Sequence, residues 1–313
     1  MKPGVLLLAY GGPATAGEVR PFIEAVLGDR PGAAGRTVRP DRVDEIVRRY
    51  EAIGGKSPLP AVVAAQAMGL ARELAGCGSP APVYVGMRFG RPTIEEALAA
   101  AGTQGVERLA ALVLAPHRSA VSRDAYHDAV ELARREARGG GPALAWGASW
   151  FEHEGFIDAL ADRVREALVK VPAAGDARAA WLVCAHSLPA ASRGVATYAG
   201  DLRATGQSLA GRFGNHPWRA VYQSRSPRAD EPWLTPDVVT AIRDAGSAGA
   251  PAVLAVPAGF VADNLEVLWD LDVEAARVAA EARVPFVRAA TVGTHPGFIR
   301  ALADAALTVL GED

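Results

Sequence analysis

Eight short apolar runs, most of them followed by a stretch with helical periodicity, constrain the fold of this chain more than any other feature. The runs are apolar at consecutive positions, so both faces of each strand must be buried, as in a parallel sheet covered by helices. Between them, segments such as "TIEEALAAAG" and "FIDALADRVREALVKV" repeat apolar residues about every 3.6 positions, which is typical of α-helices. The predicted strands are residues 5–10, 83–88, 109–116, 143–148, 179–186, 219–224, 252–258 and 284–289.

Eight strands exceed what one doubly wound sheet comfortably holds, which favours an α/β protein of two βαβ domains. The pattern breaks at "RGGGPALAW", so we predict an N-terminal domain over 1–145 and a C-terminal domain over 146–293. The last helix, within 294–313, is expected to pack back on the first domain. A TIM barrel also has eight strands, but the long loop after the first strand and the irregular helix lengths make it the less favoured alternative.

Composition limits the class of function. The chain has 313 residues and a formal net charge of −2, so no overall basic field attracts nucleic acid. No apolar run reaches the roughly 18 residues needed to cross a bilayer, and the run in "MKPGVLLLAYGGP" is too short for a secretory signal. With only Cys77 and Cys184, neither a disulfide framework nor an iron–sulfur cluster is expected. We therefore expect a cytoplasmic protein without a transmembrane segment.

Unusual polar residues gather at the ends of the predicted strands. Ligands of open parallel sheets bind beyond the carboxyl ends of the strands, so these residues predict a cleft that faces both domains. They are Tyr10, Arg88, His117, Ser119, His186, Ser187, Gln223, Ser224, Asp263 and Asn264.

Familiar catalytic motifs are missing from this rim. "AYGGP" lacks the G-x-G-x-x-G spacing of a dinucleotide site, and "IGGKSPL" lacks the first glycine of a phosphate-binding loop. "AHSLP" places a serine beside a histidine, but neighbours on a strand point in opposite directions, and no G-x-S-x-G elbow occurs. Nucleotide binding and nucleophilic hydrolysis are both poorly supported.

Glu266, Asp270 and Glu274 recur every four residues, which predicts three carboxylates on one helical face. The alternative without a functional role is an acidic stripe on a solvent-exposed helix face. Against it, the three like charges repel one another, and no lysine or arginine lies at an intervening position to compensate. A row of hard oxygen ligands leading toward the cleft suits a hydrated divalent cation in transit.

Two long motifs, "RYEAIGGKSPL" and "GFVADNLEVLWD", and the shorter "AYGGP", "LAPHRSAVSRDAY", "CAHSLP" and "YQS…PWLTPDV" follow one another along nearly the whole chain. In content, order and chain length this set resembles the ferrochelatases, which insert iron into a porphyrin at the end of haem synthesis. The resemblance implies two Rossmann-like domains with a porphyrin cleft between them. It also implies that His186 accepts protons from the porphyrin, that Glu266 across the cleft assists metal delivery, and that Asp270 and Glu274 serve the approach of the metal.

The chemistry of metal insertion fits these residue types. Two porphyrin nitrogens must lose protons as the metal enters, and a neutral imidazole with a pKa of about 6.5 is a suitable acceptor. A rigid strand end, as at "VCAHSLP", holds such an imidazole over the ring centre, while a carboxylate replaces water ligands of the metal. The tetrapyrrole and Fe²⁺ are themselves the substrates, so no organic cofactor is expected.

Acidic groups at the porphyrin edge need cations and hydroxyls. "RRYEAIGGKSPL" supplies Arg48, Arg49, Tyr50 and Ser57 around a Gly-Gly turn with backbone N–H groups free to donate. A helix C-terminus with a glycine cap is the structural alternative, and both roles are compatible. The resemblance implies carboxylate contacts from Arg49, Ser57, Ser119 and Tyr126, with Arg30 and Arg36 as further anchors in the long loop.

Tyr10 in "AYGGP" matches the branch of the family that works on coproporphyrin, where a tyrosine faces the metal opposite the histidine. The stretch "GDRPGAAGRTVRPDRVDEI" is charged and lacks aromatic residues, unlike the apolar lip of the protoporphyrin branch. Asn264 departs from the family, since many members have histidine there, which leaves the metal preference open. Protoporphyrin IX as substrate, a sirohydrochlorin chelatase and a non-catalytic porphyrin-binding protein are the alternatives. A downstream haem-pathway enzyme is the expected protein partner.

Overall fold

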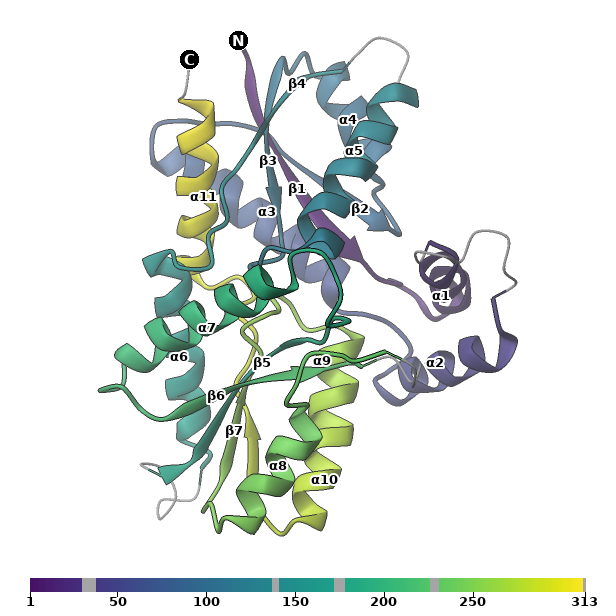
Figure 1. Cartoon of the computed structure of the whole chain (residues 1–313). Helices are drawn as coiled ribbons and strands as arrows, with labels where there is room; N and C mark the ends of the chain where they lie inside the picture. Colours follow the sequence, from purple (N-terminus) through teal and green to yellow (C-terminus); the bar gives the residue numbers. More distant parts are fainter. Residues whose placement is uncertain (30–37, 137–140, 172–177, 226–230, 312–313) are drawn as a thin grey trace.

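A computed structural model describes residues 1–29, 38–136, 141–171, 178–225 and 231–311. Its strands form two parallel four-stranded sheets, with the orders β2-β1-β3-β4 and β6-β5-β7-β8 (Figure 1). The first sheet comprises β1 (Pro3–Gly11), β2 (Val83–Phe89), β3 (Arg108–Val113) and β4 (Ala143–Trp146). The second comprises β5 (Ala180–His186), β6 (Trp218–Gln223), β7 (Val253–Val256) and β8 (Phe286–Arg288). All eight predicted strands and the α/β class are confirmed, and the TIM-barrel alternative is wrong.

Helices cover the faces of both sheets, because the strands are apolar at consecutive positions and need cover on each side. In β1, for example, the four residues from Val5 to Leu8 are all fully buried. The helices of the first half are α1 (Val19–Gly28), α2 (Pro40–Ala52), α3 (Leu59–Gly76), α4 (Ile94–Thr103) and α5 (Ala125–Glu136). Those that follow are α6 (Glu154–Leu168), α7 (Val195–Gly211), α8 (Val238–Ser247), α9 (Leu265–Trp269), α10 (Ala276–Glu281) and α11 (Pro296–Leu310).

One hydrophobic core runs through both sheets. It joins Leu7 of β1 to Val183 of β5 and Leu254 of β7 by way of residues from α6 and α11. In Figure 1, α11 lies along the upper sheet, where it contacts β3 and α3, and α6 lies along the lower sheet, where it contacts β7 and β8. The two helices also pack against each other. Each sheet is therefore covered by the helix that follows the last strand of the other sheet, α6 after β4 and α11 after β8.

A short sequence repeat builds the contact between α6 and α11. "HEGFIDALAD" begins at His153 and "HPGFIRALAD" begins at His295. Each histidine caps its own helix, accepting through Nδ1 the N–H of the glycine two residues on, at 3.1 Å in both cases. Through Nε2, each lies 3.1 Å from an aspartate of the other helix, Asp304 or Asp162. The repeat is legible in the sequence but was not among the predictions.

The first half alone carries an extra pair of helices, α1 and α2, which stand to one side of both sheets in Figure 1. They share a small hydrophobic cluster that includes Ile23, Val43 and Tyr50. α2 also contacts α9 of the second half, so this extra pair reaches the region where the two halves meet. No helix within the described ranges has the length and apolarity needed to span a membrane.

Candidate active site

His186, the last residue of β5, faces Glu266 of α9. Its Nε2 lies 3.2 Å from Oε1 of Glu266, and both side chains are a little more than one third exposed. Nδ1 lies within hydrogen-bonding distance of the carbonyl oxygen of Ser187, which fixes the ring plane. Tyr198 of α7 donates its hydroxyl to the carbonyl oxygen of His186 at 3.0 Å and so holds the strand end from behind. The two residues predicted as catalytic are therefore adjacent.

The protonation state of His186 differs from the sequence expectation. Burial alone lowers the pKa of the imidazole, but the charge and hydrogen bond of Glu266, with the Ser187 carbonyl and Asp270, outweigh it and raise the pKa to about 9. The imidazole is therefore protonated near pH 7 in the protein without substrates. The ordinary pKa of about 6.5 takes no account of Glu266, whose distance from His186 cannot be read from the sequence.

The acidic row does not continue as one regular helix. α9 ends at Trp269, and the chain from Asp270 to Ala275 is a π-helix, which makes i→i+5 hydrogen bonds. Four residues are still close to one full turn of such a helix, and the charges of both Glu266 and Glu274 act on Asp270, so the change of helix type does not break the predicted row. Asp270 is 5% exposed, whereas Glu274, one π-turn further on, is half-buried.

Asp270 also has partners that the sequence pattern did not reveal. Ser224 donates its hydroxyl to the carboxylate of Asp270, and Nη1 of Arg49 lies 3.9 Å away. Burial raises the pKa of Asp270 to about 7, although the Ser224 hydrogen bond and the Arg49 charge act in the opposite direction. No lysine or arginine lies between the three carboxylates in the sequence, as expected, but Arg49 of α2 supplies a cation from another element.

The start of α9 is fixed by two amide side chains. Asn264 is the N-cap, and its Oδ1 accepts the N–H of Val267 at 3.0 Å. Gln223, the last residue of β6 and the β-ladder partner of His186, donates Nε2 to the carbonyl oxygen of Glu266 at 2.7 Å. The strand end that carries His186 and the helix that carries Glu266 are therefore tied together through Gln223.

The first half contributes Tyr10 and Tyr50 to the same region. Tyr10, at the end of β1, is 43% exposed and its ring lies 5.0 Å from that of Phe89. Tyr50 of α2 is buried, and burial followed by the charges of Glu266 and Tyr10 raises the pKa of its phenol. Side chains from both halves thus converge around Glu266, as the predicted cleft between the halves requires.

The predicted carboxylate anchors are placed differently from one another. Arg49 is part of this region, where it also binds Glu45 at 2.8 Å and lies over the Trp269 ring. Ser57 and Tyr126 are buried, and Ser119 caps the π-helix at 120–124 through Ser122. Arg30 and Arg36 lie outside the described residues. The roles of all these residues in binding substrate remain predictions.

The Gly-Gly turn has no N–H group left for a ligand. Gly54 donates to the carbonyl of Glu51 at 3.2 Å, and Gly55 donates to that of Tyr50 at 2.7 Å. Both glycines have positive φ, 100° and 76°, as a glycine cap needs. The structural alternative, a capped helix C-terminus, is correct, and free donors at these two positions are not present.

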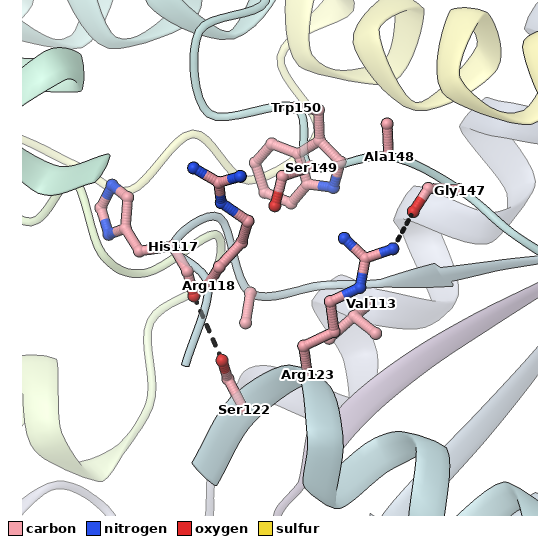
Figure 2. Close-up of a pocket in the computed structure, with 10 residues that line it drawn as sticks. Val113, His117, Arg118, Ser122, Arg123, Gly147, Ala148, Ser149 and Trp150 are labelled. Atoms are coloured by element: carbon pink, nitrogen blue, oxygen red, sulfur yellow. Dashed lines mark hydrogen bonds between the residues drawn. The ribbon is translucent and has the colours of Figure 1, made fainter. Parts of the chain in front are cut away.

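A separate small pocket lies beyond the ends of β3 and β4 (Figure 2). Its lining includes Arg123, which donates to the carbonyl of Gly147 at 2.9 Å, and Arg118, which binds Asp201 with both ends of its guanidinium. The pocket contains neither His186 nor Glu266. His117, also in the lining, is buried, and burial lowers its pKa to about 4 although Asp201 opposes the shift. Its ring packs 5.8 Å from that of Tyr198, so the pocket lies behind His186.

A family model described as Ferrochelatase matches residues 2–309. This chain belongs to the ferrochelatase family. A protein from Deinococcus radiodurans named ferrochelatase is 36% identical over 306 residues, which cover 96% of this chain and 94% of that protein. A protein from Nocardia farcinica named coproporphyrin III ferrochelatase is 35% identical, over 95% of this chain and 85% of that protein. The resemblance stated from the motifs is confirmed.

Solved structures agree on the fold of this ferrochelatase-family chain. SirB from Bacillus subtilis with Fe³⁺ superposes with a TM-score of 0.60 at 13% identity, covering 100% of this chain and 98% of that one. The CbiX structure gives a TM-score of 0.52 at 15% identity, covering 96% and 97%. At this identity the likeness speaks for the two-sheet chelatase fold alone.

No group of three or more histidine, cysteine, aspartate and glutamate side chains in the described part of the chain is arranged to hold a metal ion. His186 and Glu266 are the two predicted metal contacts that lie together, with Asp270 and Glu274 further along. In this family the metal is a substrate that leaves in the product, so a pair of contacts is chemically sufficient for delivery. Gln223 and Tyr198 hold the backbone of the pair through the carbonyl oxygens of Glu266 and His186. The sequence prediction missed Tyr198. It also missed Arg288, which binds Asp263 and Asp272, although an arginine that closes the apolar strand at 284–289 was a visible signal.

Proposed function

We propose that this chain inserts ferrous iron into coproporphyrin III. The observation that carries the proposal is the 3.2 Å pair of His186 and Glu266, which places a proton acceptor and an oxygen ligand side by side. An imidazole and a carboxylate in contact supply the two functions that metallation needs, since protons leave the ring as the metal enters. The relative from Nocardia farcinica, which is named coproporphyrin III ferrochelatase, supports the choice of porphyrin.

The raised pKa of His186 gives the order of events. Before the metal binds, the charge and the hydrogen bond of Glu266 hold a proton on the imidazole. A ferrous ion that binds Glu266 neutralises this charge, so the pKa of His186 falls and its proton leaves to solvent. The neutral imidazole then accepts the two pyrrole protons in turn and passes each one to solvent. One Fe²⁺ enters as two protons leave the ring, so charge is conserved without an organic cofactor.

Two features support a substrate with carboxylates on several sides. Arg49 lies 3.9 Å from Asp270, and its side chain is 29% exposed. Its guanidinium could therefore bind a carboxylate of the substrate in place of Asp270. Tyr10 lies near the end of β1, the strand of the first half that corresponds to β5 of the second half. The coproporphyrin branch of the family has its tyrosine at this position. Asp270 and Glu274 serve the approach of the metal. Ser57, Ser119 and Tyr126 remain further candidates for polar contacts to the ring edge.

The proposed reaction places the chain in haem biosynthesis. We place it in the cytoplasm, with an enzyme of the same pathway receiving the iron porphyrin. A direct test of this hand-off is co-purification of the product-loaded protein with the enzyme that consumes its product.

The deciding assay is anaerobic insertion of ferrous iron into coproporphyrin III and into protoporphyrin IX, followed by porphyrin absorbance. We expect coproporphyrin III to be metallated faster. A preference for protoporphyrin IX would contradict the substrate choice. Tight binding of both porphyrins without metallation of either would establish a porphyrin-binding protein instead.

A further inference from the structure

Glu266 lies in the first turn of a helical segment that runs from α9 through the π-helix into α10. α9 has five residues, so it forms barely more than one turn of hydrogen bonds. It follows directly on a loop and continues as a π-helix at Asp270. The 3.2 Å distance from Glu266 to His186 must therefore be set by contacts from other elements.

Two of these contacts come from β6, one edge of the second sheet. Gln223 holds the carbonyl oxygen of Glu266, and Ser224 holds the carboxylate of Asp270. Both act on the side of α9 next to β6. α2 also contacts α9, and Val267 and Leu271 are fully buried in the core, while a further restraint comes from the opposite edge of the sheet.

Arg288 supplies that restraint from β8, the other edge of the sheet. It binds Asp272 with two parallel hydrogen bonds, Nε to Oδ1 at 2.6 Å and Nη2 to Oδ2 at 2.8 Å. The same guanidinium reaches Asp263, with Nη1 3.2 Å from Oδ1 and Nη2 3.4 Å from Oδ2. Thr291 donates its hydroxyl to Asp263 at 3.0 Å and fixes the second carboxylate.

In the sequence, one of the two carboxylates precedes α9, the helix that carries Glu266, and the other follows it. Asp263 immediately precedes the N-cap Asn264, and Asp272 lies within the π-helix. The Arg288 side chain is 14% exposed, whereas its partners Asp263 and Asp272 are 30% and 38% exposed. Burial lowers the pKa of the guanidinium, but the hydrogen bond and charge of Asp272 and those of Asp263 more than restore it. The charge is permanent, and a planar fork can serve both partners where a lysine serves one.

We propose that Arg288 is a positioning residue that fixes Glu266 against His186 by clamping both ends of α9. It has no contact with either catalytic residue and acts through Asp263 and Asp272. This inference rests on the proposed function, because it assigns Arg288 to the same metal-delivery step.

The test compares iron insertion by Arg288→Met and Arg288→Lys with the unaltered chain. Outer partners of metal ligands typically contribute about 10- to 100-fold, so we expect kcat to fall by that factor in Arg288→Met and by less in Arg288→Lys. The KM for porphyrin should stay the same. Arg212→Met is the matched control, since Arg212 also bridges two carboxylates, Glu154 and Asp158, but on α6 away from the site. It should retain full turnover.

A double variant separates positioning from general stability. If Arg288 acts through Glu266, then Arg288→Met combined with Glu266→Gln should be no slower than Glu266→Gln alone. Losses that multiply, or unaltered turnover by folded Arg288→Met, would overturn the proposal. If Arg288→Met does not fold, the same comparison with Arg288→Lys decides it. Failure of every protein, the unaltered chain included, would contradict the proposed function and the proposal with it.

Discussion

In the first half of the chain Ala9 of β1 pairs with Met87 of β2, and in the second half Ala185 of β5 pairs with Tyr222 of β6. Met87 forms a parallel bridge with Thr93, which caps α4, and Tyr222 forms one with Asp237, which caps α8. The two halves therefore correspond residue by residue at these strand ends. The next residues along β1 and β5 are Tyr10 and His186.

The ends of β3 and β7 correspond in the same way, with charges reversed. Arg118 precedes the cap Ser119 and binds Asp201, whereas Asp263 precedes the cap Asn264 and binds Arg288. A π-helix follows in both halves. Two copies of one scaffold thus carry different side chains at matching points. The shared scaffold therefore does not determine the chemistry, since His186 at the end of β5 pairs with a carboxylate and the corresponding residue of β1 is Tyr10.

The largest expected difference between the two halves is the loss of turnover when the residue at each strand end is replaced. His186→Ala removes the proton acceptor, so kcat should fall by about 10²–10⁴-fold while porphyrin still binds. Tyr10→Phe should cost far less, because an ordinary phenol is protonated at pH 7 and accepts no pyrrole proton. Single-turnover metallation and porphyrin titration measure the two quantities. An equal loss in the two variants would mean that both strand ends take part in the chemistry.

The pairing of His186 with Glu266 predicts the pH dependence. Since the pKa of His186 is raised to about 9 in the protein without substrates, the fraction of neutral imidazole grows as the pH rises, and kcat/KM should rise with pH toward that value. Glu266→Gln removes the main raising cause, so the midpoint should move down toward the ordinary value of about 6.5, while maximal turnover falls. The same pair stabilises the fold most below pH 6.5, the ordinary value, and loses this effect as the pH rises through 9. A midpoint that stays in place would show that the two groups do not interact.

The feature that the two halves share can be tested at the crossing of α6 and α11. A Cβ on residue 297 would lie 2.5 Å from the carbonyl oxygen of Gly155, closer than real contacts allow. Gly297→Ala should therefore destabilise the protein by about 1–3 kcal/mol, although glycine-to-alanine changes in helices normally stabilise. Gly200→Ala in α7, where a Cβ meets open space, is the control and should be neutral or stabilising. The urea concentrations at the unfolding midpoints of the two variants measure the difference in stability. Equal midpoints for Gly297→Ala and Gly200→Ala would contradict a close contact between α6 and α11.

The sequence predicted those parts of the molecule that depend on local pattern. Each strand was found because residues such as Leu6, Leu7 and Leu8 are apolar in succession, and His186 was found because it ends such a run. The contact between Arg49 and Asp270 was not predicted, since 221 positions separate them and only packing of α2 against α9 joins them. The π-helix was missed because a four-residue spacing looks the same in either helix type. The raised pKa of His186 depends on a distance, which no spacing encodes.

The smallest effect is expected at Asn264, the N-cap of α9, which corresponds to the cap Ser119 of the first half. The resemblance to the family places a histidine at this position in many members. The amide oxygen of Asn264 is occupied by the N–H of Val267, so its contribution is to start α9 two residues before Glu266. Imidazoles fill this role elsewhere in the chain, at His153 and His295, through Nδ1. Asn264→His should therefore keep both stability and turnover near those of the unaltered protein. Asn264→Ala loses the cap, which should cost about 1 kcal/mol of unfolding free energy and lower turnover by displacing Glu266. A larger change in Asn264→His than in Asn264→Ala, measured by unfolding midpoint and iron insertion, would show that the residue touches the metal and does more than cap a helix.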